Sequence, residues 1–63
     1  MEFNLKDIRI NANMTQTELA EKSGVGRITI NRMENGELKE TTLGTLSKLA
    51  KTLCVSIDEL IKP

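Results

Sequence analysis

The sequence is poor in the residues that hold very small domains together covalently or through a metal. It has one cysteine and no histidine, so it can form no disulfide within the chain and offers few soft metal ligands. A chain of 63 residues buries only about 60% of its unfolded surface, which leaves self-association as the remaining aid to stability. The same absences, with the lack of a glycine-rich phosphate loop, make an enzyme the weakest interpretation and predict no cofactor and no metal site.

Long apolar runs and an excess of charge of one sign are also missing. Charged residues interrupt the chain every few positions, so no stretch approaches the roughly 20 apolar residues of a membrane-spanning helix, and no secretory signal is evident. We therefore expect a cytoplasmic protein with no membrane partner. Nine basic and nine acidic residues cancel, and the pI of 6.2 argues mildly against a general attraction to nucleic acid.

What the chain does contain is a series of short segments with apolar residues at helical spacing, separated by turn signals. With one aromatic residue and few β-branched runs, this pattern predicts a single all-α domain over residues 1–63. Five helices are expected: one ending near Ala12, then Gln16 to about Ser23, Arg27 to Glu34, one that follows Thr42, and a short one after Ser56.

Capping residues support these boundaries. Thr15 with Glu18, and Ser56 with Glu59, each have the pattern of a capping box at a helix start. Gly24 can supply the positive φ that is common just past a helix end. The residues expected on the apolar sides of the last two helices are Leu46, Leu49, Ala50 and Leu53, followed by Leu60 and Ile61.

Residues 15–36 are the most informative stretch, because two short helices joined by a tight glycine-containing turn can project the second helix clear of the domain. In that second helix, Ile30 and Met33 fall on one side. The opposite side carries Arg27, Ile28, Asn31 and Arg32. A DNA major groove is about 12 Å wide and admits one helix, so this side is a candidate for contact with base edges.

Each of these side chains also has an ordinary interpretation. Arg27 and Arg32 could grip guanine with the guanidinium fork, bind a phosphate, or be solvated arginines. Ile28 could meet a thymine methyl group or be one of the exposed isoleucines common on protein surfaces. Asn31 could contact adenine or water.

Two further positions could bind the DNA backbone. Gln16 lies in the first turn of the second helix, where its amide and the free backbone N–H groups can meet a phosphate, although a solvated glutamine would look the same. Asn35 and Gly36 are foremost a helix stop. The candidate phosphate contacts are Gln16, Thr17, Asn35 and Lys39.

Several short motifs stand at a characteristic spacing. They are T-Q-x-x-L-A at residues 15–20, G-V at 24–25 and E-N-G at 34–36, followed by the helical pattern of residues 46–53. Together they resemble the Cro and phage-repressor helix-turn-helix family, also called the xenobiotic response element (XRE) family of bacterial and phage regulators. The resemblance covers nearly the whole chain.

The resemblance implies a compact five-helix lambda-repressor-like domain that binds double-stranded DNA. Base contacts would come from Arg27, Ile28 and Arg32, and sometimes from Thr29 or Asn31. Gln16 and Asn35 would touch phosphates. Arg9 would pair with Glu34 inside the domain, a structural role that removes one basic residue from DNA contact.

The chain departs from the family pattern in three places. Gly26 stands where many members have a serine or threonine cap, a loss of about a few tenths of a kcal/mol. Cys54 takes a position where glycine is common, and a left-handed backbone there would cost roughly 1 to 2 kcal/mol; we interpret its side chain as packing rather than chemistry. The loop at residues 37–41 is about one residue longer than usual and carries two acids, Glu37 and Glu40.

The favoured function is a transcription repressor that acts as a homodimer on a near-palindromic operator, with repression preferred over activation on family habit alone. No small-molecule effector is evident. The candidate dimer interface is Val55, Ile57, Leu60 and Ile61, although these residues could equally close the core of a monomer. The alternative function is a protein-interaction module, such as an antitoxin or adaptor, on the same fold.

Overall fold

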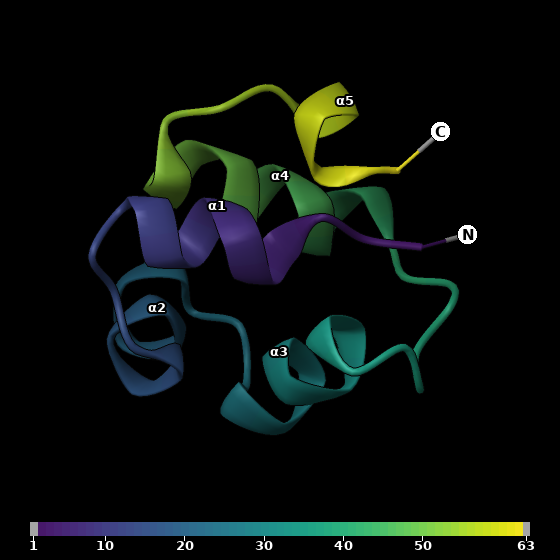
Figure 1. Ribbon diagram of the computed structural model, residues 1–63, viewed down its shortest axis with the longest axis horizontal. Helices are drawn as coiled ribbons and strands as arrows, with labels where there is room; N and C mark the ends of the chain where they lie inside the picture. Colours follow the sequence, from purple (N-terminus) through teal and green to yellow (C-terminus); the bar gives the residue numbers. More distant parts are fainter. Residues whose placement is uncertain (1, 63) are drawn as a thin grey trace.

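Five helices follow one another along residues 2–62, the part of the chain that the computed structural model describes (Figure 1). They are α1 (Leu5–Asn11), α2 (Gln16–Ser23), α3 (Arg27–Glu34), α4 (Leu43–Leu53) and α5 (Ile57–Leu60). The all-α prediction is confirmed, and each expected helix is found within a residue or two of its predicted bounds. No helix within these residues is both long enough and apolar enough to span a membrane.

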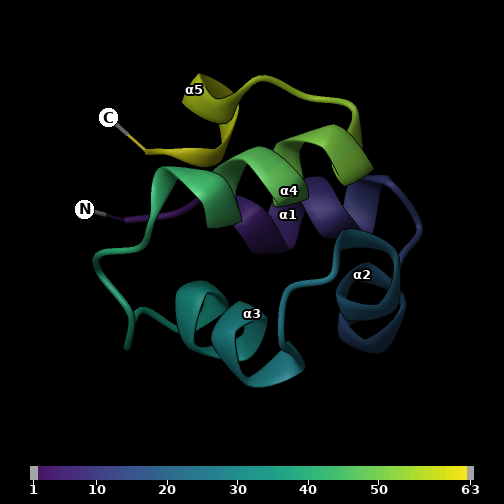
Figure 2. The same cartoon turned by 180° about the vertical axis from the view of Figure 1, so that it is seen from behind.

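The helices enclose one core, with α2 packed on both α3 and α4, α1 on α3, and α5 on α4. Figures 1 and 2, seen from opposite sides, both place α3 along the lower edge of the molecule and α5 at the top. One long side of α3 therefore faces away from the rest of the chain.

Side-chain caps fix the starts of α2 and α4. The Thr15 hydroxyl accepts a hydrogen bond from the Glu18 amide at 3.0 Å, while the Glu18 carboxylate accepts from the Thr15 amide at 3.1 Å. The bond from the Thr15 backbone amide, followed by the Thr15 side chain, holds the pKa of the Glu18 carboxyl below its usual value. The Thr42 hydroxyl accepts from the Thr45 amide at 3.1 Å at the start of α4. The first predicted capping box is confirmed in full.

The second predicted capping box forms only in half. The Ser56 hydroxyl accepts from the Glu59 amide at 3.3 Å, but no bond returns from the Glu59 side chain to the Ser56 amide within the described residues. Helix α5 ends at Leu60, so the expectation that Ile61 lies on its apolar side is wrong. Ile61 has an extended backbone and pairs with Phe3 in an antiparallel bridge. This pairing is possible because α5 ends after four residues, just before Ile61.

This bridge ties the two ends of the described chain together. The Asn4 amide donates to the Leu60 carbonyl at 2.8 Å, and the Lys62 amide donates to the Glu2 carbonyl at 2.9 Å. Figure 1 shows both ends leaving the same side of the molecule. Phe3 is brought into the core by this pairing, with only 6% of its surface exposed.

The core draws on every helix. Its fully buried large side chains are Leu5, Leu19, Ile30, Met33, Leu49 and Leu60. Burying one leucine or isoleucine side chain contributes about 1.5–3 kcal/mol, so this set supplies much of what holds so short a chain together. The predicted apolar side of α4 is confirmed, because Leu46, Leu49, Ala50 and Leu53 are all buried.

The burial of Leu60 corrects one expectation about the surface. Leu60 is 0% exposed and packs inside the chain, so it cannot form part of an interface between copies. Val55, Ile57 and Ile61 are only partly buried against the core and still reach the surface. The apolar C-terminal segment thus closes the core of the monomer first.

Left-handed backbone follows α2, α3 and α4. Gly24 after α2 has φ of 78°, as predicted, and Gly36 after α3 has φ of 83°. Cys54 after α4 adopts the same conformation, with φ of 58° and ψ of 42°. Its side chain is exposed, so the expected packing role is wrong: the left-handed turn carries residue 54 outside the core before Val55 returns to it, with the Val55 amide donating to the Ala50 carbonyl at 3.0 Å.

Candidate nucleic-acid interface

The α2–α3 turn is short and anchored, which fixes how α3 is presented. Val25 is 7% exposed and joins the core in the middle of the turn, a role that the sequence pattern did not single out. Its amide donates to the Ser23 hydroxyl at 3.2 Å. On α3 itself, Ile30 and Met33 face inward and are 0% and 2% exposed. The opposite side of α3 is thereby held toward solvent by the packing of its own helix.

Four side chains of that opposite side, Arg27, Ile28, Asn31 and Arg32, form what we call the outer face of α3. All four are exposed, and Ile28 has 69% of its surface in solvent. With Glu37 they line one shallow hollow of about 340 Å³. Thr29 is half-buried and does not line this hollow. The structure therefore brings together four of the five candidate base-contacting residues.

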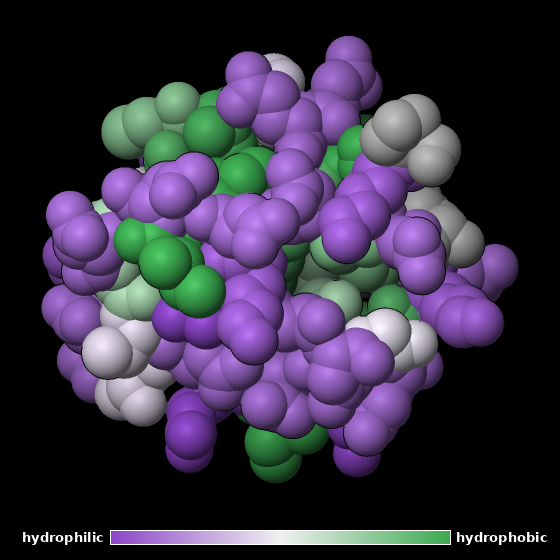
Figure 3. Space-filling view, in the orientation of Figure 1, coloured by the Kyte–Doolittle hydropathy of each residue, from purple (hydrophilic) through white to green (hydrophobic). Residues whose placement is uncertain are grey.

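The space-filling view shows the setting of this face. Along the lower edge of the molecule, one apolar group projects over α3 between hydrophilic side chains (Figure 3). Ile28 is the exposed large hydrophobic residue of α3. A lone apolar side chain flanked by arginine and asparagine suits a mixed surface such as the major groove, in which methyl groups lie beside hydrogen-bonding atoms.

Behind the outer face, α1 and α3 are joined by an ion pair. The Arg9 guanidinium donates from Nε to Glu34 Oε2 at 2.7 Å and from Nη2 to Glu34 Oε1 at 3.0 Å. Its Nη1 donates to the Met14 carbonyl at 2.8 Å. The two charged side chains are only 11% and 4% exposed, and the Arg9 guanidinium is directed to Glu34 and the Met14 carbonyl.

The pair shifts both pKa values toward the charged forms. Burial alone would raise the pKa of the Glu34 carboxyl, but hydrogen bonds from Arg9 and Gln16 and the positive charges of Arg9 and Lys6 outweigh it and hold that pKa below its usual value. The hydrogen bond to Glu34 raises the pKa of Arg9. Both groups are therefore ionised at neutral pH.

A chain of side-chain amides continues from this pair to the surface. Gln16 Nε2 donates to Glu34 Oε1 at 3.0 Å, and Gln16 Oε1 accepts from Asn31 Nδ2 at 3.4 Å. Asn31 Oδ1 in turn accepts from Asn35 Nδ2 at 3.3 Å. One hydrogen-bonded row, which begins at the part-buried carboxylate of Glu34, thus holds three candidate DNA contacts: Gln16, Asn31 and Asn35.

Glu37 lies at the end of this row and was not identified from the sequence as part of the site. Its amide donates to Asn35 Oδ1 at 3.0 Å, and its carboxylate accepts from Asn35 Nδ2 at 3.3 Å. Its other carboxylate oxygen is 3.9 Å from Arg32 Nε. The signal that could have revealed it is the Asn35-Gly36 stop, because a left-handed glycine there folds the next residue back toward the helix.

This arrangement, with a packed α2, a tight turn and an α3 whose exposed side carries two arginines, also agrees with comparison to known proteins. The chain matches the model of the helix-turn-helix family over residues 5–60. It belongs to this family. The match confirms the resemblance to the Cro and phage-repressor type and its lambda-repressor-like fold, and it makes the chain a DNA-binding helix-turn-helix regulator. No curated protein matches the chain.

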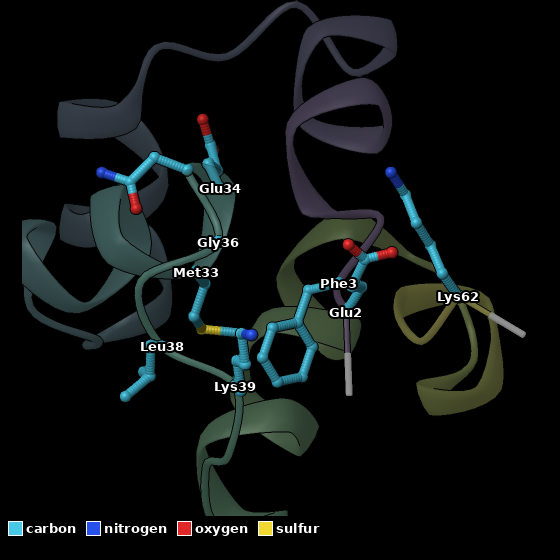
Figure 4. A pocket seen from close by; sticks show the side chains of 9 residues that line it. Glu2, Phe3, Met33, Glu34, Gly36, Leu38, Lys39 and Lys62 are labelled. Carbon is cyan, nitrogen blue, oxygen red and sulfur yellow. The ribbon is translucent and has the colours of Figure 1, made fainter.

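Two other candidate phosphate contacts of the helix-turn-helix lie apart from the outer face of α3. Thr17 is exposed in the first turn of α2. Lys39 lines a separate hollow of about 180 Å³ between the N-terminal segment and the end of α3. In Figure 4, Lys39 runs up beside Met33, and the Phe3 ring lies across the same space. Ligand pockets usually measure roughly 300–1,000 Å³, so we interpret this hollow as a packing gap beside the interface.

Proposed function

We propose that this helix-turn-helix protein represses transcription by binding as a homodimer to a near-palindromic operator. Each protomer would place α3 in the major groove, with the two copies of α3 about 34–36 Å apart. The observation that carries the proposal is the outer face of α3, on which Arg27, Ile28, Asn31 and Arg32 are exposed with no acidic residue of the helix among them.

The chemistry of that face suits a mixed sequence of bases. Arg27 and Arg32 can each donate two hydrogen bonds to guanine O6 and N7, and Ile28 fits a thymine methyl group. Asn31 is already engaged with Gln16 and Asn35, so in this proposal it contributes one remaining amide hydrogen to a base rather than a bidentate contact to adenine. Thr29, which is half-buried, is assigned a lesser part.

The backbone contacts would flank α3. Gln16 stands in the first turn of α2, and its Nε2 has a second N–H left after the bond to Glu34. A phosphate there would meet this N–H together with the free backbone amides of the helix start. Thr17, Asn35 and Lys39 are exposed and complete the proposed set. These contacts position the protein but carry no sequence information.

Dimerisation follows from the charge balance. The chain has no net charge, so long-range attraction adds little, and one protomer makes few phosphate contacts. A second protomer doubles those contacts, and each neutralised phosphate strengthens binding by releasing counterions. The proposed interface is Val55, Ile57 and Ile61, which remain partly exposed on the described surface.

The test is selection of bound duplexes from a random pool, followed by titration of the selected operator with variants. Arg32→Ala should weaken operator binding by about 1–3 kcal/mol and relax the preference at one base pair. Gln16→Ala should weaken binding to all sequences about equally. The matched control is Lys51→Ala, which removes an exposed positive charge from α4 and should leave the base preferences unchanged.

The outcomes separate the proposal from its main alternative. Loss of binding in the double variant Arg27→Ala/Arg32→Ala, with retention in Lys51→Ala, supports groove binding by α3. If the unaltered protein shifts no duplex even at low salt, sequence-specific DNA binding is wrong for this chain and a protein partner on the same face becomes the better account. Sedimentation of the protein with and without the operator tests the homodimer separately.

A further inference from the structure

Glu37 forms one wall of the hollow whose other walls are the outer face of α3. It is the one acidic residue in that lining. Gly36, with φ of 83°, turns the chain back, and the Leu38 amide then donates to the Arg32 carbonyl at 3.1 Å. The loop after α3 is thereby held against the last turn of the helix, and Glu37 lies beside Arg32.

The Glu37 carboxylate is held in place by its neighbours. Asn35 Nδ2 donates to Glu37 Oε1 at 3.3 Å, and Asn35 Oδ1 accepts from the backbone amide of Glu37 at 3.0 Å, so one bond holds the carboxylate and the other holds its backbone. The contact of Oε2 with Arg32 is longer, at 3.9 Å, and the two side chains are 64% and 60% exposed. An ion pair this exposed is weak, so both groups remain available to an incoming ligand.

A carboxylate next to the major groove is selective because it can only accept hydrogen bonds. Guanine and thymine present acceptor atoms at their groove edges, and every phosphate presents them as well. These acceptors repel a carboxylate. Cytosine offers the N4 amino group as its donor, and its own groove edge carries no acceptor; the nearest one is O6 of the paired guanine. Adenine also has an amino group, but its N7 acceptor stands next to that group and opposes a carboxylate.

We propose that Glu37 is a specificity residue that accepts a hydrogen bond from cytosine N4 at the base pair next to the one contacted by Arg32. The inference rests on the proposed placement of α3 in the major groove. It gives the loop after α3 a share in sequence selection. The proposal also accounts for an acidic residue next to DNA. Without a hydrogen bond from a base amino group, the Glu37 carboxylate would only repel the phosphates and weaken binding.

The experiment compares three proteins in the same selection from a random duplex pool: the unaltered chain, Glu37→Gln and Glu40→Gln. Glu40 is the matched control, because it is an exposed acid of the same loop that takes no part in the bonds to Asn35. At one base pair the unaltered chain should prefer cytosine over the other bases by about fivefold to tenfold. This is near the lower end of the discrimination that one good base contact usually provides.

In Glu37→Gln this preference should fall below about twofold, while the preferences due to Arg27 and Arg32 persist, because a glutamine amide can donate as well as accept. Glu40→Gln should keep the cytosine preference and change affinity for all sequences alike. Thermal melting followed by circular dichroism verifies that each variant is folded.

Three results would overturn the proposal. Glu37→Gln could raise affinity equally for every sequence, which would make Glu37 a repulsive charge only. It could leave all base preferences unchanged, or the unaltered chain could select a base other than cytosine at every pair sensitive to Glu37. If the unaltered chain selects no sequence at all, the proposed function itself fails, so that failure is distinct from the others.

Discussion

Removing the guanidinium of Arg9 should destabilise the domain, because the Glu34 side chain with which it pairs is only 4% exposed. In Arg9→Met the carboxylate of Glu34, whose side chain is 4% exposed, would lose two hydrogen bonds of 2.7 and 3.0 Å and its partner in the ion pair. The Met14 carbonyl would lose the hydrogen bond from Arg9 Nη1. Only Gln16 would still donate to that carboxylate within the described residues. Breaking a fully buried pair on one side costs about 3–5 kcal/mol, so breaking this part-buried pair should cost about 3 kcal/mol.

That cost is large against the whole stability of the chain. At about 0.05–0.15 kcal/mol per residue, a chain of 63 residues is stable by roughly 3–9 kcal/mol. Arg9→Met should therefore lose from about a third to all of the stability of the domain at 25 °C. The double variant Arg9→Met/Glu34→Leu removes the stranded charge as well and should recover at least about 1 kcal/mol relative to Arg9→Met, because apolar replacements of a buried pair are far better tolerated.

The assay is urea denaturation followed by circular dichroism, with Arg32→Met as the matched control. Arg32 also pairs with a glutamate, but at 3.9 Å and with both side chains more than half exposed, so its loss should cost less than about 1 kcal/mol. The reasoning is refuted if Arg9→Met and Arg32→Met cost the same, or if the double variant is no more stable than Arg9→Met.

Three other predictions concern stability. Stability should fall as the pH drops below 4.5, because folding lowers the pKa of the Glu34 carboxyl. Such a group contributes stability above its unfolded pKa, and this contribution is lost as the pH falls through the folded pKa. In urea titrations Glu34→Gln should lack this part of the pH dependence, and an unchanged pH profile in that variant would contradict the prediction. Cys54→Gly should gain up to about 1 kcal/mol by relieving the left-handed backbone at φ of 58°, whereas Cys54→Ala, which keeps a Cβ, should not gain; equal melting temperatures of the two would contradict this. Gly26→Ser should stabilise the domain by about a few tenths of a kcal/mol and so raise the melting temperature slightly, because the added hydroxyl can cap α3. There is room for it, since a Cβ at Gly26 meets nothing closer than Thr29 Oγ1 at 3.9 Å. A lower melting temperature would show that the serine is not accommodated.

The sequence predicts the helices well because their ends are encoded locally. Thr15 and Thr42 cap α2 and α4 through side chains that reach only three residues ahead, and Gly24 ends α2 with its own backbone. The spacing of Ile30 and Met33 likewise determines which side of α3 faces the core. These local signals are sufficient to derive the exposed position of Arg27 and Arg32 from the residue pattern alone.

What the sequence could not predict depends on contacts between distant segments. Ile61 leaves the helical pattern because Phe3, near the other end of the chain, pairs with it, and no local signal identifies that partner. Leu60 could have faced either a second copy or the core, since both environments favour leucine. The residue pattern shows Glu37 only as an acid in a loop, and its place beside Arg32 depends on how the turn at Gly36 folds back.

The hydrogen-bonded row from Glu34 through Gln16, Asn31 and Asn35 to Glu37 has a consequence for how this protein can change its target. A substitution at Asn31 would alter not only one proposed DNA contact but also the support of the side chains on either side of it. Effects of substitutions in the row should therefore depend on one another, so that a new binding preference would require compensating changes in α2 and in the loop. Replacing α3 alone with the corresponding helix of another protein would therefore transfer only part of that protein's binding specificity.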